Sequence, residues 1–327
     1  MRVLPVQDVA RLLNVLINIE AAFGAREVSA SFDAHLPRNY YVYVLIDVRL
    51  PRCPAAQAAF GGYGRGPMMA NGSTFLLKNA HIIDPQQNID GVMNVVISDG
   101  KIAAIGEDVS AADAVVLDLS GSYVTPGWID IHTHAYGALG FSDPDSIGVY
   151  QGVTSVVDAG GTGILTLDEF QAMVRDQTIT SVYAGAHVHP LGIIGFEESG
   201  RGLNNIAVEK WVEWAAANPG VLRYLKVSAY SLPSAGPLYI GKGLAETLGL
   251  PLYQHIGEMQ EPPPYPTLVE DVFRIAQAGD IVTHVYHNNP GKGIGDDGKV
   301  LPFVRDAERR GGLFDIGFGS RNFAWPV

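Results

Sequence analysis

Apolar and polar residues alternate over short segments in the first patterned part of the chain. Between residues 74 and 118, four segments have the composition and the two-residue period of β-strands. The turn Ser98-Asp99-Gly100 joins two of them as a hairpin, because glycine adopts the positive φ that a tight turn requires. Four such strands are too few to close a domain alone. The predicted strands are Thr74–Asn79, Val92–Ser98, Lys101–Gly106 and Val115–Asp118.

From Tyr123 onward, strand-like apolar runs alternate with segments of helical period. This alternation indicates βαβ units, in which helices cover a parallel sheet. Seven such strands are found, whereas a closed barrel needs eight. The sequence therefore predicts an α/β fold, a (β/α)8-type TIM barrel lacking its last strand, with a small partial β-sandwich. The predicted strands are Gly127–His132, Ser155–Asp158, Ser181–His187, Leu222–Ser228, Leu252–His255, Ile281–Val285 and Phe314–Gly317, and the predicted helices are Leu167–Arg175, Val208–Ala217, Leu244–Leu248, Leu268–Ala278 and Phe303–Arg310.

The composition of the chain changes near residue 70. Lysine is absent before Lys78, and a glycine- and proline-rich stretch leads up to Met68 and Met69. One interpretation is that residues 1–73 are an extension and that the native start is one of these methionines. The other is a genuine N-terminal helix and strand, and the sequence leaves both open. The helix would be Val9–Phe23 and the strand Tyr40–Val48; the predicted domains are 1–73 (extension), 74–122 (partial β-sandwich) and 123–327 (incomplete barrel).

Bulk composition excludes several classes of protein. Hydrophobic residues make up 47% and charged residues 17%, as in a soluble globular protein. The net charge of −12, without a lysine or arginine run, disfavours nucleic-acid binding. No apolar run approaches the roughly 20 residues of a membrane helix. The lone Cys53 excludes an internal disulfide framework and a cysteine-rich metal site, which is consistent with a cytoplasmic protein.

The sharpest chemical feature is a His-x-His motif at the end of a buried strand. The segment reads Gly127-Trp128-Ile129-Asp130-Ile131-His132-Thr133-His134. Strand alternation puts His132 and His134 on one side, facing the barrel interior at its carboxyl end. Two neutral imidazoles there can share a divalent metal ion at about 2.0–2.1 Å each. The alternative is a pair of polar residues that close a strand.

Three further candidates lie at the ends of later strands. Lys226 lies in an apolar strand, where an ammonium group is costly unless it is paired or its charge is removed. The alternative is an ion-paired lysine or one that extends to solvent. His255 and His284 each end a strand, and either one alone would be better explained as a core histidine. Their shared position at the catalytic rim favours a joint site.

A second His-x-His motif, His187 and His189, follows the third barrel strand. We expect both residues to bind substrate, although a rival metal site stays open. Tyr230 is a further candidate for a substrate-side wall. His287, three residues after His284, would become a ligand if the register of that strand were different.

The segments Leu76–Pro85 and Val124–His134, with the hairpin between them, resemble the start of proteins of the amidohydrolase superfamily. The later strands are most similar to the dihydroorotase-like deacetylases, which act on N-acetyl or O-acetyl compounds. The resemblance covers roughly Thr74 to Phe323. It implies a (β/α) barrel, a small β-sandwich built from both chain ends, and two zinc ions bridged by a carboxylated lysine.

Carried over to this chain, the resemblance implies a role for each candidate residue. His132 and His134 would bind a first divalent metal ion, and His255 and His284 a second. Lys226 would be the catalytic, carboxylated bridge between them. The implied activity is that of a metal-dependent amidohydrolase that cleaves an acyl C–N or ester bond with a metal-activated hydroxide. It would be a deacetylase with a small-molecule substrate, a small N-acetyl or O-acetyl compound. The alternatives are a dihydroorotase or hydantoinase acting on a cyclic amide, and a non-catalytic metal-binding fragment.

One residue of the family's metal site has no counterpart in this sequence. The family has an aspartate at the end of the eighth strand, and we assign no residue to it. Asp315 lies in the seventh strand and is not given that role. We therefore expect metal binding with weak hydrolysis, or poor folding. Open β edges would favour association into a homo-oligomer.

Overall fold

The computed structural model describes residues 74–137, 143–198, 206–258, 260–319 and 322–324. The expected N-terminal helix and strand lie outside the described residues. The chain divides into two compact units. The first extends to Asp130 and includes Pro144–Val156 and Ile179–Ser181, and the second comprises Ile131–Asp143, Val157–Thr178 and Val182–Val327.

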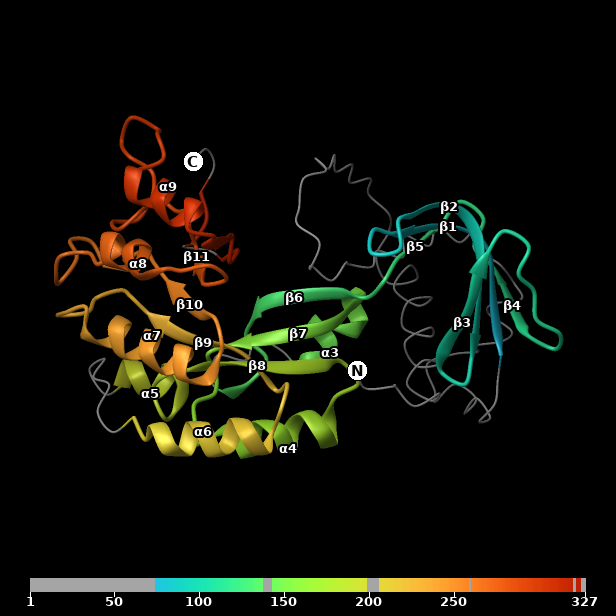
Figure 1. The fold of residues 1–327 in the computed structure, drawn as a ribbon, viewed down its shortest axis with the longest axis horizontal. Helices are drawn as coiled ribbons and strands as arrows, with labels where there is room; N and C mark the ends of the chain where they lie inside the picture. The colour runs from blue at the N-terminus through green and yellow to red at the C-terminus, as the bar shows by residue number, and fades with distance from the viewer. Residues whose placement is uncertain (1–73, 138–142, 199–205, 259, 320–321, 325–327) are drawn as a thin grey trace. The chain divides into compact units, whose positions relative to one another are not determined.

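The first unit contains a five-stranded sheet (Figure 1). Four strands follow the order β3-β2-β1-β4, and β5 also pairs with β1. β1 pairs antiparallel with β2 and parallel with β4 and β5. Asp99 and Gly100 both have positive φ, 51° and 70°, so the predicted hairpin turn is confirmed. The strands are β1 (Phe75–Asp84), β2 (Ile89–Ser98), β3 (Lys101–Gly106), β4 (Val115–Asp118) and β5 (Tyr123–Val124).

β1 is longer than the sequence predicts, because an irregularity at Asn79 does not end it. Asn79 has a φ of 61°, and the register with β2 shifts between Leu77 and Ala80. The extra residue changes the parity of the strand, so that the side chains in the core are those of Phe75 and Leu77 before the shift and of Ala80 and Ile82 after it. One continuous apolar face results. Its core is formed by Phe75, Leu77, Ala80, Ile82, Val95 and Leu119.

The remaining strands form one seven-stranded sheet in the order β12-β11-β10-β9-β8-β7-β6. Pairing is parallel between successive strands from β8 to β12. Sequential parallel strands with intervening helices are the architecture of a (β/α) barrel, so the predicted fold class is confirmed. The strands are β6 (Trp128–Thr133), β7 (Val153–Ala159), β8 (Ser181–His187), β9 (Leu222–Ser228), β10 (Leu252–His255), β11 (Ile281–Thr283) and β12 (Leu313–Asp315).

The longer helices of the second unit lie side by side along the sheet (Figure 1). α7 packs against β9 and β10, with α6 and α8 as its neighbours, and α8 also packs on α9. Among the helices of the described ranges, none has the length and hydropathy needed to cross a bilayer. The helices are α3 (Pro144–Ile147), η2 (Val149–Gln151), α4 (Leu167–Gln177), α5 (Gly192–Glu198), α6 (Val208–Ala217), α7 (Gly236–Leu248), α8 (Val269–Ile275) and α9 (Pro302–Arg309).

α7 begins eight residues before its predicted start at Leu244. The part of α7 before Leu244 contains Gly241 and Gly243, which weaken the helical signal in the sequence. Gly241 is explained by packing: a Cβ there would lie 2.4 Å from the side chain of Val227. The glycine lets the helix approach β9 closely.

Two stacked tyrosines fill the interior of the sheet. The rings of Tyr224 and Tyr253 are stacked with their centroids 4.3 Å apart, and both side chains are buried. The Tyr224 hydroxyl donates to the Ile131 carbonyl oxygen at 2.8 Å. Gly185 pairs with Tyr224 across the sheet, and a Cβ on it would lie 1.9 Å from the tyrosine ring. The stack therefore depends on the missing side chain at this position.

Replacing Gly185 with alanine should displace Tyr224 and destabilise the fold. Overpacking of a filled core costs about 1–3 kcal/mol. Urea unfolding followed by circular dichroism measures the change. Gly243→Ala is the matched control, because its Cβ meets nothing within 4 Å in a helix, and it should leave stability unchanged or raise it slightly. Equal stability of Gly185→Ala and the wild type would contradict the packing described here.

Candidate active site

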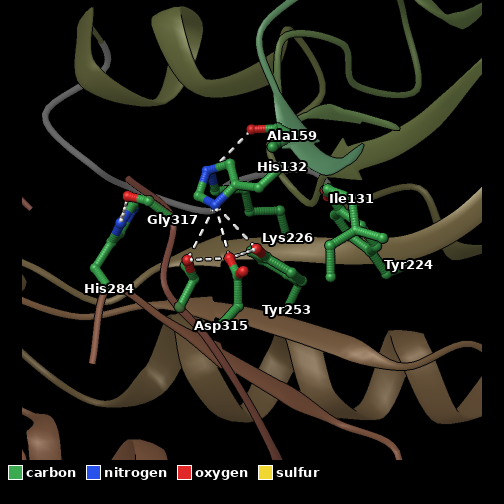
Figure 2. Close-up of polar contacts among 10 residues, drawn as sticks. Ile131, His132, Ala159, Tyr224, Lys226, Tyr253, His284, Asp315 and Gly317 are labelled. Carbon is green, nitrogen blue, oxygen red and sulfur yellow. Dashed lines mark hydrogen bonds and ion pairs between the residues drawn. The ribbon is translucent and has the colours of Figure 1, made fainter. Parts of the chain in front are cut away.

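Four imidazoles from three strands meet at the carboxyl end of the parallel sheet. His132 lies in β6, His134 follows it, His255 ends β10 and His284 follows β11. The ring centroids are 5.8 Å apart for His132 and His134, 4.9 Å for His132 and His284, and 4.2 Å for His255 and His284. Lys226 of β9 lies among them, with Nζ 3.5 Å from His132 Nε2 (Figure 2). The structure thus brings together the five residues that the sequence singled out as metal ligands.

The burial of this cluster keeps the imidazoles neutral. Desolvation is the main cause that lowers the pKa of His132 to about 4, of His134 to about 3 and of His284 to about 2, and the nearby Lys226 lowers each further. Burial also holds the pKa of His255 well below its ordinary value. Neutral imidazole is the form that ligates metal ions.

His255 shows most clearly that the cluster suits a cation. Its side chain is 5% exposed, and within the described residues neither ring nitrogen has a hydrogen-bond partner. Buried polar atoms in native proteins nearly always have a partner, so an unpaired imidazole calls for one. A divalent ion would supply it, and the donor set fits one chemically. The described side chains nevertheless contain no group of three or more His, Cys, Asp or Glu residues at metal-binding spacing.

The ring of His284 is held by the backbone. Its Nδ1 lies 2.7 Å from the Gly317 carbonyl oxygen, which can only accept. Nδ1 therefore carries the proton, and the lone pair is on Nε2. Gly317 has a φ of 52°, and a Cβ there would lie 2.4 Å from the imidazole. His284 itself has a φ of 66°, which explains why β11 ends at Thr283 rather than at the predicted Val285.

Lys226 is a buried amine without a carboxylate partner in direct contact. It is 1% exposed, and Nζ donates to the Ala159 carbonyl oxygen at 2.8 Å. None of the ion pairs found among the described residues includes Lys226. Burial lowers its pKa to about 8, against the opposing effect of Asp158 and Asp315. The amine is thus partly neutral near physiological pH.

Asp315 contacts the cluster directly, although no sequence pattern places it there. Its Oδ2 lies 3.1 Å from His132 Nδ1 and accepts a hydrogen bond of 2.8 Å from Thr283 Oγ1 (Figure 2). The Tyr253 hydroxyl donates to the same oxygen. Burial raises the pKa of Asp315, but the hydrogen bonds from His132 and Tyr253 outweigh it, so the pKa lies below its ordinary value. The carboxylate is therefore ionised.

The candidate substrate-binding residues lie at different distances from the cluster. His187 pairs with Lys226 across the sheet and is fully buried. Its Nδ1 accepts a hydrogen bond of 3.0 Å from the His189 backbone N–H, so its proton is on Nε2, which has no hydrogen-bond partner among the described residues. The Tyr230 ring lies 4.6 Å from the His255 ring, and its hydroxyl donates to Glu197. His189 Nδ1 is 3.3 Å from the Leu191 N–H and contributes to the loop after β8.

Two buried carboxylates that the sequence did not single out shape the loops around the cluster. Asp158 accepts backbone hydrogen bonds from Ala135 at 2.9 Å and from Gly161 at 2.8 Å, which ties the segment after His134 to the end of β7. Glu258 accepts bonds from the Ser231 backbone N–H and hydroxyl, each at 2.7 Å. Their positions in the sequence could have marked both residues as candidates, because Asp158 ends a predicted strand and Glu258 lies three residues after His255.

Known proteins resemble this chain both in sequence and in structure. No family model matches the chain. A deacetylase from Agrobacterium fabrum is 29% identical over 238 residues, which are 70% of this chain and 57% of the relative. Solved structures of an adenine deaminase (27% identity, TM-score 0.67) and a dihydroorotase (26% identity, TM-score 0.65) are also similar; each likeness covers 77% of this chain and 67% of that structure.

The sequence relatives and the two structures agree on one class of protein. These likenesses support a member of the amidohydrolase superfamily, as the His-x-His segment and the later strands indicated. It spans 57% and 61% of the lengths of the two deacetylases that it matches first.

Proposed function

We propose that the protein is a metal-dependent hydrolase of acyl C–N or ester bonds, and specifically a deacetylase of small N-acetyl or O-acetyl compounds. The observation that carries this proposal is the meeting of four neutral imidazoles around a buried lysine at the carboxyl end of a barrel sheet. Active sites of such barrels lie at this end. Sequence relatives named deacetylase support the choice of reaction.

The donor set suggests two divalent ions, most simply zinc. His132 and His134 would hold one ion, His255 and His284 the other, and Lys226 would lie between them. Imidazole nitrogens are ordinary zinc ligands, and the pKa shifts keep all four rings in the ligating form. The chemistry that such ions supply is acidification of water and polarisation of the scissile carbonyl.

Lys226 is proposed to be carboxylated. A neutral amine can form an N–C bond with carbon dioxide while its proton passes to solvent, which leaves a carbamate anion. The lowered pKa of Lys226 provides the neutral amine. The modification would convert a buried cation into an oxygen donor for cations, and so would account for a lysine that is 1% exposed without a carboxylate in direct contact.

Substrate contacts are proposed for His187, Tyr230 and His189. The Nε2–H of His187 is a buried donor next to Lys226, suited to a carbonyl oxygen of the substrate. Tyr230 presents its ring beside His255 and is held there by Glu197, which suits it to be a wall for the acyl group. His189 belongs to the loop after β8 and would contact the outer part of a substrate.

A cyclic-amide hydrolase is the second candidate. Two similarities favour it: a solved dihydroorotase structure resembles this chain, and one of the sequence relatives is named dihydroorotase. Dihydroorotase and hydantoinase reactions open a ring at an amide bond, and the same imidazole cluster would serve them. The two candidates differ in the shape of the substrate rather than in the metal site.

The wild-type protein should bind about two equivalents of zinc per chain, measured by elemental analysis after removal of free metal. Replacing both His132 and His134 with alanine should remove tight binding of at least one equivalent, because two of the proposed ligands are lost. His81→Ala is the matched control, since His81 lies in the separate five-stranded sheet and pairs with Asp90. Unchanged zinc content in the double variant would refute the ligand assignment.

Activity assays should separate the two candidate reactions. We expect acetate release from a panel of N-acetyl amino acids and O-acetyl compounds, lost on chelation and restored by zinc. Dihydroorotate and hydantoin should react more slowly, as followed by ultraviolet absorbance. Faster ring opening would favour the second candidate. A zinc-loaded protein that turns over neither class would contradict both and leave a non-catalytic metal-binding chain.

A further inference from the structure

We propose that Asp315 is a positioning residue that fixes the tautomer and the orientation of His132, so that Nε2 is presented to a metal ion. This inference rests on the proposed function, because it assumes that His132 is a ligand. It adds a residue to the site from β12, a strand from which the sequence supplied no candidate.

The hydrogen atoms around His132 Nδ1 can be assigned one by one. Three oxygens surround this nitrogen: Asp315 Oδ2 at 3.1 Å, Thr283 Oγ1 at 3.0 Å and the Tyr253 hydroxyl at 2.9 Å. Each hydroxyl has a single hydrogen, and both donate it to Asp315 Oδ2. All three oxygens therefore face Nδ1 as acceptors, and Nδ1 must carry the imidazole proton.

The opposite nitrogen of the ring then holds the lone pair and is an acceptor. This nitrogen, Nε2 of His132, faces Lys226 Nζ at 3.5 Å (Figure 2). Three oxygens that all accept require an N–H on the ring nitrogen that faces them. This nitrogen is Nδ1, so the contact with Asp315 favours the Nδ1-protonated tautomer of His132.

Asp315 is itself held rigidly enough to act in this way. Thr283 pairs with it across β11 and β12, and Tyr253 reaches it from β10 while stacked on Tyr224. The hydroxyls of Thr283 and Tyr253 both donate to Oδ2 and so set the direction of the carboxylate independently of His132. The contact joins residues 183 positions apart, from the two end strands of the sheet order.

The same segment orients a second imidazole. Gly317, two residues after Asp315, accepts the Nδ1–H of His284 at 2.7 Å. β12 and the residues after it thus supply the acceptors for two of the four imidazoles. His255, by contrast, has no hydrogen-bond partner on either nitrogen among the described residues. β12 and the segment that follows it therefore orient the imidazoles of His132 and His284.

The first test uses the metal-free protein. Long-range ¹H–¹⁵N correlation spectra of the wild type, assigned with His132→Gln, should show His132 protonated at Nδ1. Asp315→Ala should shift it toward the Nε2-protonated form, whereas Asp176→Ala, an exposed change on α4, should not. A wild-type His132 protonated at Nε2, or no shift in Asp315→Ala, would overturn the inference whatever the metal data show.

The second test measures zinc affinity by competition with a chelator. Loss of an outer carboxylate partner typically weakens metal binding 10–100-fold, and we expect this for one ion in Asp315→Ala. Asp315→Asn, which keeps an acceptor oxygen, should recover part of the loss. Tyr253→Phe removes one hydrogen-bond donor to Asp315 but leaves the carboxylate in place, so it should weaken zinc binding less. This variant tests the role of Asp315 even if Asp315→Ala folds poorly.

The outcomes separate this inference from the proposed function. Zinc binding by the wild type with equal affinity in Asp315→Ala, Asp315→Asn and Tyr253→Phe would overturn the role of Asp315 and leave the function standing. A wild-type protein that binds no zinc would refute the proposed function. The tautomer of His132 would then still report whether Asp315 orients the ring.

Discussion

Desolvation at the carboxyl end of the parallel sheet is the constraint on which the rest of the site depends. Four imidazoles and an ammonium group lie close together there, and water reaches them poorly. Burial disfavours the charged form of each group, which lowers every pKa in the cluster. The result is a set of neutral nitrogen donors, which is what a divalent cation requires.

The fold provides this environment through small residues placed beside large ones. Gly185 makes room for Tyr224, whose stack with Tyr253 fills the interior of the sheet and carries a hydroxyl up to Asp315. Gly317 makes room for the His284 ring, and its carbonyl oxygen accepts the hydrogen bond from His284 Nδ1. Packing and hydrogen bonding therefore act together, and ring orientation is decided by groups outside the cluster itself.

Much of the architecture could be predicted from the sequence, because apolar strands buried on both faces give a strong signal. The bounds of β8, β9 and β10 agree with the predicted ones. Errors arose where single residues change the backbone. Asn79 marks an irregularity that β1 continues through, and the glycines of α7 conceal half of that helix. Both effects depend on neighbouring strands that a local pattern does not contain.

The candidate site could be predicted only in part. His132, His134, Lys226, His255 and His284 stood out because each ends or interrupts an apolar strand, and the structure brings them together. Asp315 did not stand out, because its role depends on the approach of two strands far apart in the sequence. The hydroxyls of Tyr253 and Thr283 gave no signal either, since both residue types are ordinary in strands.

The proposed metal site is tested most directly by an anomalous difference map at the zinc edge, from crystals of the protein grown with zinc. We expect peaks within bonding distance, about 2.0–2.1 Å, of imidazole nitrogens of His132, His134, His255 and His284. Peaks at surface carboxylates alone, with the four imidazoles free of metal, would contradict it.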